Sequence, residues 1–101
     1  MLSLAWIQNS IKKDQYYFSK HGDIERKNDK LEIIEVEQSI LNGTMLEKYV
    51  NTGRGESCLV AGYSIEGKPI HAVIGKRGSE AVIITVYIPK PPKFKTIYER
   101  L

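Results

Sequence analysis

The chain has 101 residues, of which 42% are hydrophobic and 27% are charged, and its formal net charge is +3. This length and composition fit one ordinary globular domain and leave no room for a second domain or a large organic cofactor. The longest apolar run, residues 81–88, has the length of a strand and falls far short of the roughly 18 residues of a membrane span. We therefore expect one domain that has no cofactor and does not bind a membrane.

The cysteine and histidine content bears on compartment and on metal binding. Cys58 is the only cysteine, so no internal disulfide can form, and this favours a reducing cytoplasm. Residues 2–7 have no basic flank and are too short for a signal peptide. One cysteine and two histidines do not suffice for a four-ligand structural zinc site. The sequence predicts a cytoplasmic protein without a metal.

The excess positive charge lies at the C-terminus. Residues 90–101 hold four basic residues and one acidic residue, a sum of +3: Lys90, Lys93, Lys95, Arg100 and Glu99. A basic tail beside a neutral body suits contact with a nucleic acid backbone or an acidic protein. The alternative is a solvated, frayed terminus. Phe94, Ile97, Tyr98 and Leu101 have the spacing of a short helical turn, through which the tail can pack back onto the body.

Helical periodicity dominates residues 1–43. Apolar residues three and four positions apart indicate a helix over residues 3–13, with Ser3 as its N-cap. Residues 16–19 are predicted to be briefly extended, and Ser19 is predicted to cap a second helix over residues 20–28. A third helix is predicted over residues 31–41, ended by Asn42-Gly43.

From residue 44 the apolar pattern has a period of two. It predicts strands at residues 44–51, 57–65, 69–75 and 80–88, joined by short turns that contain glycine. Pro89 ends the last strand, because proline cannot continue the hydrogen-bond ladder. We therefore expect an α+β fold, with N-terminal helices packed on one face of a four-stranded antiparallel meander (residues 44–89), followed by the basic tail.

The turns predict which side chains share a face of that sheet. A two-residue turn at Glu66-Gly67 pairs Gly62 with His71 and places both on the face opposite the core. Leu59 and Ala61 then lie on the core face. Gly62 beside His71 would leave a shallow open space.

The last turn admits two registers. A three-residue loop, residues 76–78, places Thr85 and Tyr87 on the His71 face, whereas a two-residue loop would bury both among aliphatic side chains. The apolar pattern favours the three-residue loop.

Four segments carry, in order, the motifs of a known family. They are residues 18–26 ("S-x-H-A-x-x-R"), residues 43–49 ("G-x-x-I-E-x-Y"), residues 67–73 ("G-R-P-L-H-V-V") and residues 82–89 ("I-I-T-V-Y-x-P"). Over residues 16–89 the chain resembles a bacterial family described only as a domain of unknown function. Such proteins are often encoded beside zinc-finger antitoxins of the MqsA/YgiT type and are similar to the RelE, BrnT and MqsR toxins. Gly22 stands where the family usually has alanine, and Phe94 where a tryptophan often follows.

The resemblance implies a RelE/barnase-like fold and a toxin-type ribonuclease that cleaves single-stranded or messenger RNA without a metal. It also implies an antitoxin, of the zinc-finger type, as protein partner. The competing hypothesis is a non-catalytic module that binds protein or RNA through the same surface.

The candidate catalytic residues occur in two groups. His21 and Glu25 are four residues apart on one helix face and Arg26 is within reach, a set that can move protons and bind phosphate. The alternative is a purely structural role, in which the His–Glu pair stabilises the helix and the arginine is a surface residue. His71 lies in mid-strand, so it either is buried with a hydrogen-bond partner or faces a cleft. Tyr87 adds a hydroxyl on its face.

RNA cleavage without a metal needs a base, an acid and a cation for the phosphate. We assign base and acid to His21 and His71 and the cation to Arg26 or Arg77, and we expect the two rings within roughly 10 Å of each other across an accessible cleft. Further RNA contacts are expected from Lys76, Arg77, Thr85, Lys90, Lys93 and Lys95.

Overall fold

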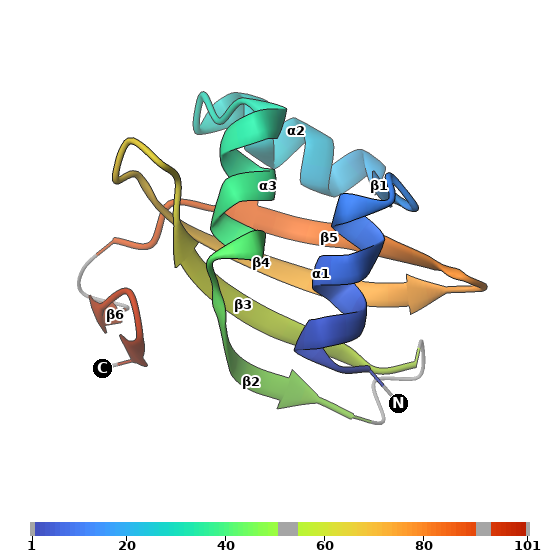
Figure 1. The fold of residues 1–101 in the computed structure, drawn as a ribbon. Helices are drawn as coiled ribbons and strands as arrows, with labels where there is room; N and C mark the ends of the chain where they lie inside the picture. The colour runs from blue at the N-terminus through green and yellow to red at the C-terminus, as the bar shows by residue number, and fades with distance from the viewer. Residues whose placement is uncertain (1, 51–54, 91–93, 101) are drawn as a thin grey trace.

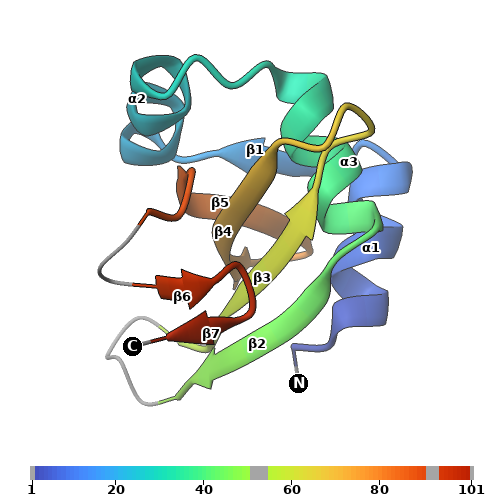
Figure 2. The same ribbon diagram turned by 90° about the vertical axis from the view of Figure 1, so that its left-hand side faces the viewer.

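The computed structural model describes residues 2–50, 55–90 and 94–100. The helices are α1 (Leu4–Lys12), α2 (Lys20–Asn28) and α3 (Ile33–Leu41); the strands are β1 (Tyr16–Phe18), β2 (Thr44–Tyr49), β3 (Ser57–Tyr63), β4 (Pro69–Arg77), β5 (Glu80–Tyr87), β6 (Phe94–Thr96) and β7 (Glu99–Arg100). Helices α1 and α3 cover one side of the main sheet, here called the helix face (Figure 1). The β6–β7 hairpin lies on the other side, here called the hairpin face (Figure 2).

The main sheet has five strands in the order β1-β5-β4-β3-β2. The four predicted strands pair antiparallel, as expected, and the fold is α+β. β1 adds a fifth strand, which pairs parallel to β5 from Tyr16↔Ala81 to Phe18↔Ile83. The four-strand prediction is wrong on this point, because three residues are too few to show a period of two.

The helices begin and end close to their predicted positions. Ser3 and Ser19 are the N-caps of α1 and α2, and their hydroxyls accept hydrogen bonds from the backbone N–H of Trp6 and Gly22. α3 begins later than predicted, at Ile33, behind a capping box formed by Glu32 and Glu35. Among the described residues, no helix is long and apolar enough to cross a membrane.

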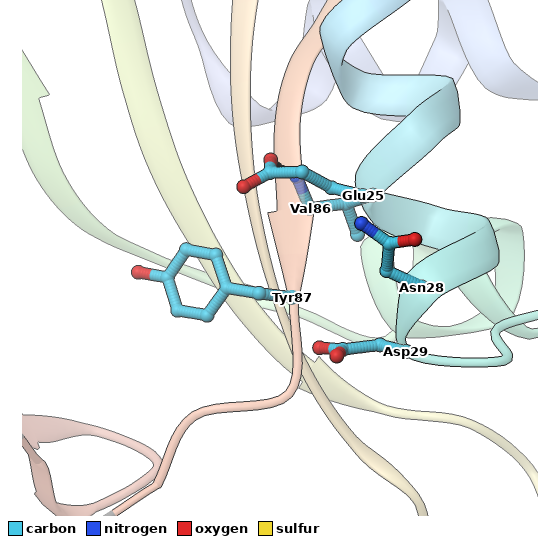
Figure 3. Close-up of a pocket in the computed structure, with 5 residues that line it drawn as sticks. All are labelled: Glu25, Asn28, Asp29, Val86 and Tyr87. Carbon is cyan, nitrogen blue, oxygen red and sulfur yellow. Dashed lines mark hydrogen bonds between the residues drawn. The ribbon is translucent and has the colours of Figure 1, made fainter.

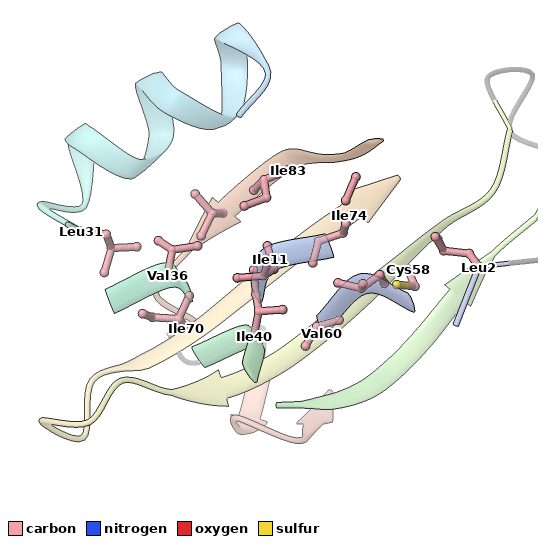
Figure 4. Close-up of a cluster of buried hydrophobic side chains, with 14 residues drawn as sticks. Leu2, Ile11, Leu31, Val36, Ile40, Cys58, Val60, Ile70, Ile74 and Ile83 are labelled. Atoms are coloured by element: carbon pink, nitrogen blue, oxygen red, sulfur yellow. The ribbon is translucent and has the colours of Figure 1, made fainter. Parts of the chain in front are cut away.

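The hydrophobic core lies between the helix face of the sheet and helices α1 and α3 (Figure 4). Ile7 of α1, Val36 and Ile40 of α3, and Ile70 and Ile74 of β4 all have no exposed surface. Burying an aliphatic side chain of this size stabilises the fold by about 1.5–3 kcal/mol. The helix face is therefore the side that holds the domain together.

The register of β3 against β4 differs by one residue from the prediction. Ser64 pairs with Lys68 across a three-residue loop in which Gly67 has φ +89°, so His71 lies opposite Ala61. Gly62 consequently lies on the helix face, where an added Cβ would be 2.0 Å from the carbonyl oxygen of Ser39 in α3. The predicted open space between Gly62 and His71 does not exist. The backbone of α3 packs directly against Gly62 on the helix face.

The shift exchanges the two faces of β3. Cys58 and Val60 face the helices in the core cluster, whereas Leu59 and Ala61 lie on the hairpin face. Both pairs are buried, so the hydrophobic pattern of β3 has no contrast between its faces. Turn geometry alone decides the register here.

The β4–β5 hairpin contains features of both registers considered above. Its loop is the tight two-residue form, because Arg77 pairs with Glu80 and Gly78 has φ +61°. A register shift between Val73 and Ile74 then restores the alternation, so that Thr85 pairs with Val73 on the hairpin face. Thr85 and Tyr87 therefore share the His71 face, as predicted, although the predicted loop is wrong.

The C-terminal residues form a β-hairpin rather than the predicted helical turn. Between its strands, Ile97 is buried and the Tyr98 ring packs edge-on against Tyr63, with 6.2 Å between ring centroids. The tail thus packs back on the hairpin face, as expected, but by a different element. Lys93 and Leu101 lie outside the described residues.

Candidate functional site

His71 is completely buried beneath the C-terminal hairpin. Its Nε2 is hydrogen bonded to the carbonyl oxygen of Ile97, and its Nδ1 lies 3.4 Å from the Tyr87 hydroxyl. A carbonyl oxygen can only accept, so Nε2 carries a proton, and in the neutral form of the ring Nδ1 accepts from Tyr87. Two environments were expected for His71, burial with a hydrogen-bond partner or exposure to a cleft. The structure shows the first.

His21 has the opposite environment, because its side chain on the first turn of α2 is 67% exposed. Its Nε2 lies 3.3 Å from Oε1 of Glu25, so the two predicted residues do share a helix face. The same Oε1 accepts a hydrogen bond from the backbone N–H of Val86, which holds Glu25 against β5.

The predicted meeting of two histidine rings across an accessible cleft is therefore wrong. His71 has no surface that solvent or substrate can reach. Glu25, the partner of His21, and Tyr87, the partner of His71, line the same pocket.

Arg26 acts within the fold. Its guanidinium donates to Oδ1 of Asp23 through two nitrogens and to the carbonyl oxygen of Leu31, and it lies 5.6 Å from the centroid of the Phe18 ring. Arg26 lowers the pKa of the Asp23 carboxyl, and Lys27 adds to the effect. The Arg26 side chain is 14% exposed and fixes the chain between α2 and α3, so the contacts observed for it are structural, and phosphate binding by Arg26 stays a prediction.

Helix α2 covers the part of the β5 edge that β1 leaves free. β1 pairs only as far as Ile83. Beyond it, Glu25 of α2 accepts the backbone N–H of Val86 in β5, and Asp29, the C-cap of α2, accepts that of Ile88 just after β5. Gly22 allows this close approach, since an added Cβ would lie 2.5 Å from the carbonyl oxygen of Ile83. An alanine, usual in the resembling family at this position, would need α2 to shift.

A pocket of about 180 Å³ opens where α2 meets the end of β5 (Figure 3). Its lining residues come from both elements: Glu25, Asn28, Asp29, Val86 and Tyr87. Figure 3 shows the Tyr87 ring extending from β5 on the side away from Asn28 and Asp29. No lysine, arginine or histidine is among the lining residues, so the pocket is acidic, with one aromatic residue in its lining. We call it the Glu25–Tyr87 pocket.

Sequence reasoning missed Asn28 and Asp29. The signal was available, because they follow Glu25 by three and four residues, which places all three on one face of α2. What the sequence did not indicate is that this face borders β5.

The predicted RNA-binding cations lie at two different places. Lys76 and Arg77 end β4 at the hairpin tip, about 20 Å along the strand from His71 at six residues of about 3.3 Å each. The Lys76 ammonium lies 5.2 Å from the centroid of the Trp6 ring. They are therefore too far away to share a phosphate with Tyr87.

The remaining predicted contacts lie nearer the pocket. Thr85 is half-buried on the hairpin face, and Lys90 is exposed shortly after the pocket residue Tyr87. Lys95 is in β6, and its side chain, like all of Lys93, lies outside the described residues.

The other acidic and thiol groups with shifted pKa values, in the part of the chain that the structure describes, have structural roles. Lys68 and the backbone N–H of Glu32 bind the Glu35 carboxyl and lower its pKa, which ties the β3–β4 loop to α3. Burial raises the pKa of the Cys58 thiol to about 11, so this cysteine is unreactive at neutral pH. Across the described ranges, no group of three His, Cys, Asp or Glu residues is placed to hold a metal ion.

Comparison with known proteins places this pocket within a family. No curated protein and no solved structure matches the chain. A family model matches residues 18–88, which include only the last residue of β1 but all of α2 and both strands of the β4–β5 hairpin. The matched part thus contains every residue that lines the pocket, and the chain belongs to the family of the domain of unknown function DUF4258.

Proposed function

We propose that the protein is a metal-independent endoribonuclease whose reaction centre is the rim of the Glu25–Tyr87 pocket. One observation carries the proposal. Glu25 and Tyr87, two of the predicted catalytic residues, come from different elements and line one pocket, and each contacts one of the predicted histidines. This arrangement supports acid/base chemistry at a single site.

The exposed His21–Glu25 pair suits the role of general base. His21 takes the proton of the RNA 2′-hydroxyl, and Glu25 at 3.3 Å stabilises the imidazolium that forms. The 2′-oxygen then forms a bond to phosphorus while the bond between phosphorus and the 5′-oxygen breaks. The products are a 2′,3′-cyclic phosphate and a 5′-hydroxyl, so the reaction needs neither water nor a metal.

The Tyr87 hydroxyl suits the role of general acid at the leaving 5′-oxygen. It lies 3.4 Å from Nδ1 of the buried His71, which orients it and is itself held by the Ile97 carbonyl. In the reaction the Tyr87 O–H turns from Nδ1 to the 5′-oxygen and gives it the proton, which leaves a tyrosinate beside His71. Tyr87 thus contacts the substrate together with His21, and His71 is a positioning residue.

The negative charge of the pocket favours binding of the RNA phosphate outside it. The lining includes two carboxylates, Glu25 and Asp29, which repel an anion. Lys90 is exposed and follows the end of β5, three residues after the lining residue Tyr87. We assign phosphate binding to Lys90 and to the other tail lysines.

The proposal includes the biological setting that the family resemblance implies. A toxin that cleaves messenger RNA works in the cytoplasm and is held inactive by an antitoxin, here of the zinc-finger type. Helices on one face of a largely antiparallel sheet are compatible with a RelE/barnase-like ribonuclease.

A non-catalytic binding module is the second candidate, and one observation favours it. Glu25 and Asp29 already accept backbone N–H groups of β5, so both carboxylates have a structural use that needs no substrate. In that case the pocket would bind a partner without turnover.

A cleavage assay separates the two candidates. The purified chain is incubated with a fluorescent single-stranded RNA, alongside His21→Gln, Tyr87→Phe and the exposed control Glu66→Gln. We expect cyclic-phosphate ends from the parent and the control, and a loss of about 100-fold in each site variant, the usual size of a general acid or base effect. Cleavage of an all-2′-deoxy strand, or full activity of His21→Gln, would contradict the mechanism. Binding without cleavage would favour the module.

A further inference from the structure

We propose that the Glu25–Tyr87 pocket binds a guanine base of the RNA and that Asp29 is the residue that selects it. This inference rests on the proposed function, because it names the nucleotide held beside the reaction centre. Four observations support the inference: the charge of the pocket, the need of a carboxylate for hydrogen-bond donors, the Asn28 amide and the aromatic lining residue Tyr87.

The charge of the pocket decides which part of a nucleotide can enter. Its lining carries Glu25 and Asp29 and no basic side chain, so the phosphate is excluded. A base is neutral and can offer N–H groups to a carboxylate. The base therefore enters the pocket, and the phosphate stays at the rim near His21 and Lys90.

A carboxylate distinguishes guanine from the other three bases. Guanine alone has two adjacent donors, N1–H and the 2-amino group, on its Watson–Crick edge, and these match the two oxygens of a carboxylate. Adenine and cytosine place a ring-nitrogen acceptor beside their amino group, and uracil flanks its single N–H with two carbonyl oxygens. An acceptor facing a carboxylate is repelled, so the other bases bind less well.

Asp29 is the better placed of the two carboxylates for this role. Its Oδ2 accepts the backbone N–H of Ile88 at 2.9 Å, which fixes the carboxylate at the wall of the pocket while other lone pairs remain available. Glu25 is already shared between His21 and the backbone N–H of Val86. A fixed acceptor loses little freedom when it binds a ligand.

The other lining residues fit the remaining features of guanine. The Asn28 amide can donate to the O6 of guanine, which a carboxylate cannot do. Tyr87 also lines the pocket, and aromatic side chains stack on bases in other sites for single-stranded RNA. An arginine side chain from a protein partner also suits two carboxylates and a ring, but it leaves the Asn28 amide donors without an acceptor.

Binding of nucleoside 3′-monophosphates tests the inference independently of cleavage. The affinities of the guanosine, adenosine, cytidine and uridine forms are measured by NMR titration, with argininamide as a fifth probe. We expect the guanosine form to bind at least about tenfold more tightly than the others, because a bidentate contact discriminates by this order. Asp29→Asn should remove this preference and keep an oxygen for the Ile88 N–H, whereas Glu66→Gln, a remote carboxyl-to-amide change, should keep it.

The possible results separate this inference from the proposed function. Cleavage with no preference among the four bases, together with equal nucleotide affinities, would overturn the guanine site and leave the ribonuclease intact. Guanosine-selective binding without cleavage would support the guanine site and contradict the ribonuclease. Binding of argininamide alone, lost in Asp29→Asn, would overturn the inference in favour of a basic protein partner.

Discussion

The two faces of the main sheet differ in what their side chains do. The helix face is uniformly apolar and closed by α1 and α3, with Val60, Ile70 and Ile74 buried against them. The hairpin face carries His71, Thr85 and Tyr87 and is covered in part by the short β6–β7 hairpin. If the proposed function holds, stability and chemistry are separated between the two faces of this small domain. A change on one face is expected to affect folding, and a change on the other to affect binding.

Two glycines on opposite faces provide the largest expected contrast. An alanine Cβ at Gly62 would lie 2.0 Å from the Ser39 carbonyl oxygen, which belongs to the α3 backbone, whereas at Gly75 the nearest atom is the mobile Cδ1 of Ile84, at 3.0 Å. We expect Gly62→Ala to lower the free energy of unfolding by about 3 kcal/mol or more and Gly75→Ala by about 1 kcal/mol. Urea unfolding followed by circular dichroism measures both. Equal losses would mean that the two faces are packed alike.

Arg26 provides the next contrast, because it adjoins Glu25 in sequence but acts in the fold. Arg26→Met is expected to cost about 2 kcal/mol of stability, since it removes charged hydrogen bonds to Asp23 and Leu31. Lys27→Met removes an exposed pair with the same Asp23 and is expected to cost less than about 0.5 kcal/mol. Thermal unfolding of the two variants gives the comparison. If Arg26→Met were as stable as the parent but unable to bind RNA, Arg26 would belong to the site after all.

The ion pair between Glu35 and Lys68 makes the stability of the helix side dependent on pH. The folded pKa of Glu35 lies below the ordinary 4.5, so its ion pair contributes fully above that value. The contribution is lost as the pH falls through the lowered folded pKa. The stability difference between the parent and Glu35→Gln should therefore shrink between about pH 6 and about pH 3. A constant difference in urea midpoints over this range would show that the charge of Glu35 does not matter.

The smallest expected effect concerns the cations at the two ends of the β4–β5 hairpin. Lys90→Ala should weaken the binding of single-stranded RNA and flatten its salt dependence by about 0.7 log units, the value for one phosphate contact. Lys76→Ala, at the opposite end beside Trp6, should leave the slope unchanged. Fluorescence titrations at several salt concentrations measure both slopes. The reverse result would move the RNA to the hairpin tip.

The sequence was sufficient to predict most of the local structure. Capping by Ser3 and Ser19, the bounds of α2 and the four antiparallel strands follow from short-range patterns, and all are observed. The pairing of β1 was not predictable, because a three-residue strand has no periodicity of its own. Which face of β3 meets the helices was equally undetermined, since both of its faces are apolar.

Two residues that line the pocket, Glu25 and Tyr87, were singled out from the sequence, but the arrangement of the pocket was not predictable. The pairing of His21 with Glu25 follows from helical spacing, and Tyr87 shares the face of His71 as expected. The cover over His71 depends on the C-terminal hairpin, a long-range contact that no local pattern encodes. The same holds for Asp29, whose place in the pocket depends on α2 lying along the β5 edge.

The central claim is that RNA binds on the hairpin side, at the pocket between α2 and β5. NMR shift mapping with an all-2′-deoxy oligonucleotide, which cannot be cleaved through a 2′-hydroxyl, tests this claim most directly. The account predicts that the largest shifts occur at the backbone amides of Glu25, Asn28, Asp29 and Tyr87, with none at the helix-face residues Val60 and Ile74. Shifts confined to α1 and α3, or to the Lys76–Gly78 tip, would contradict it.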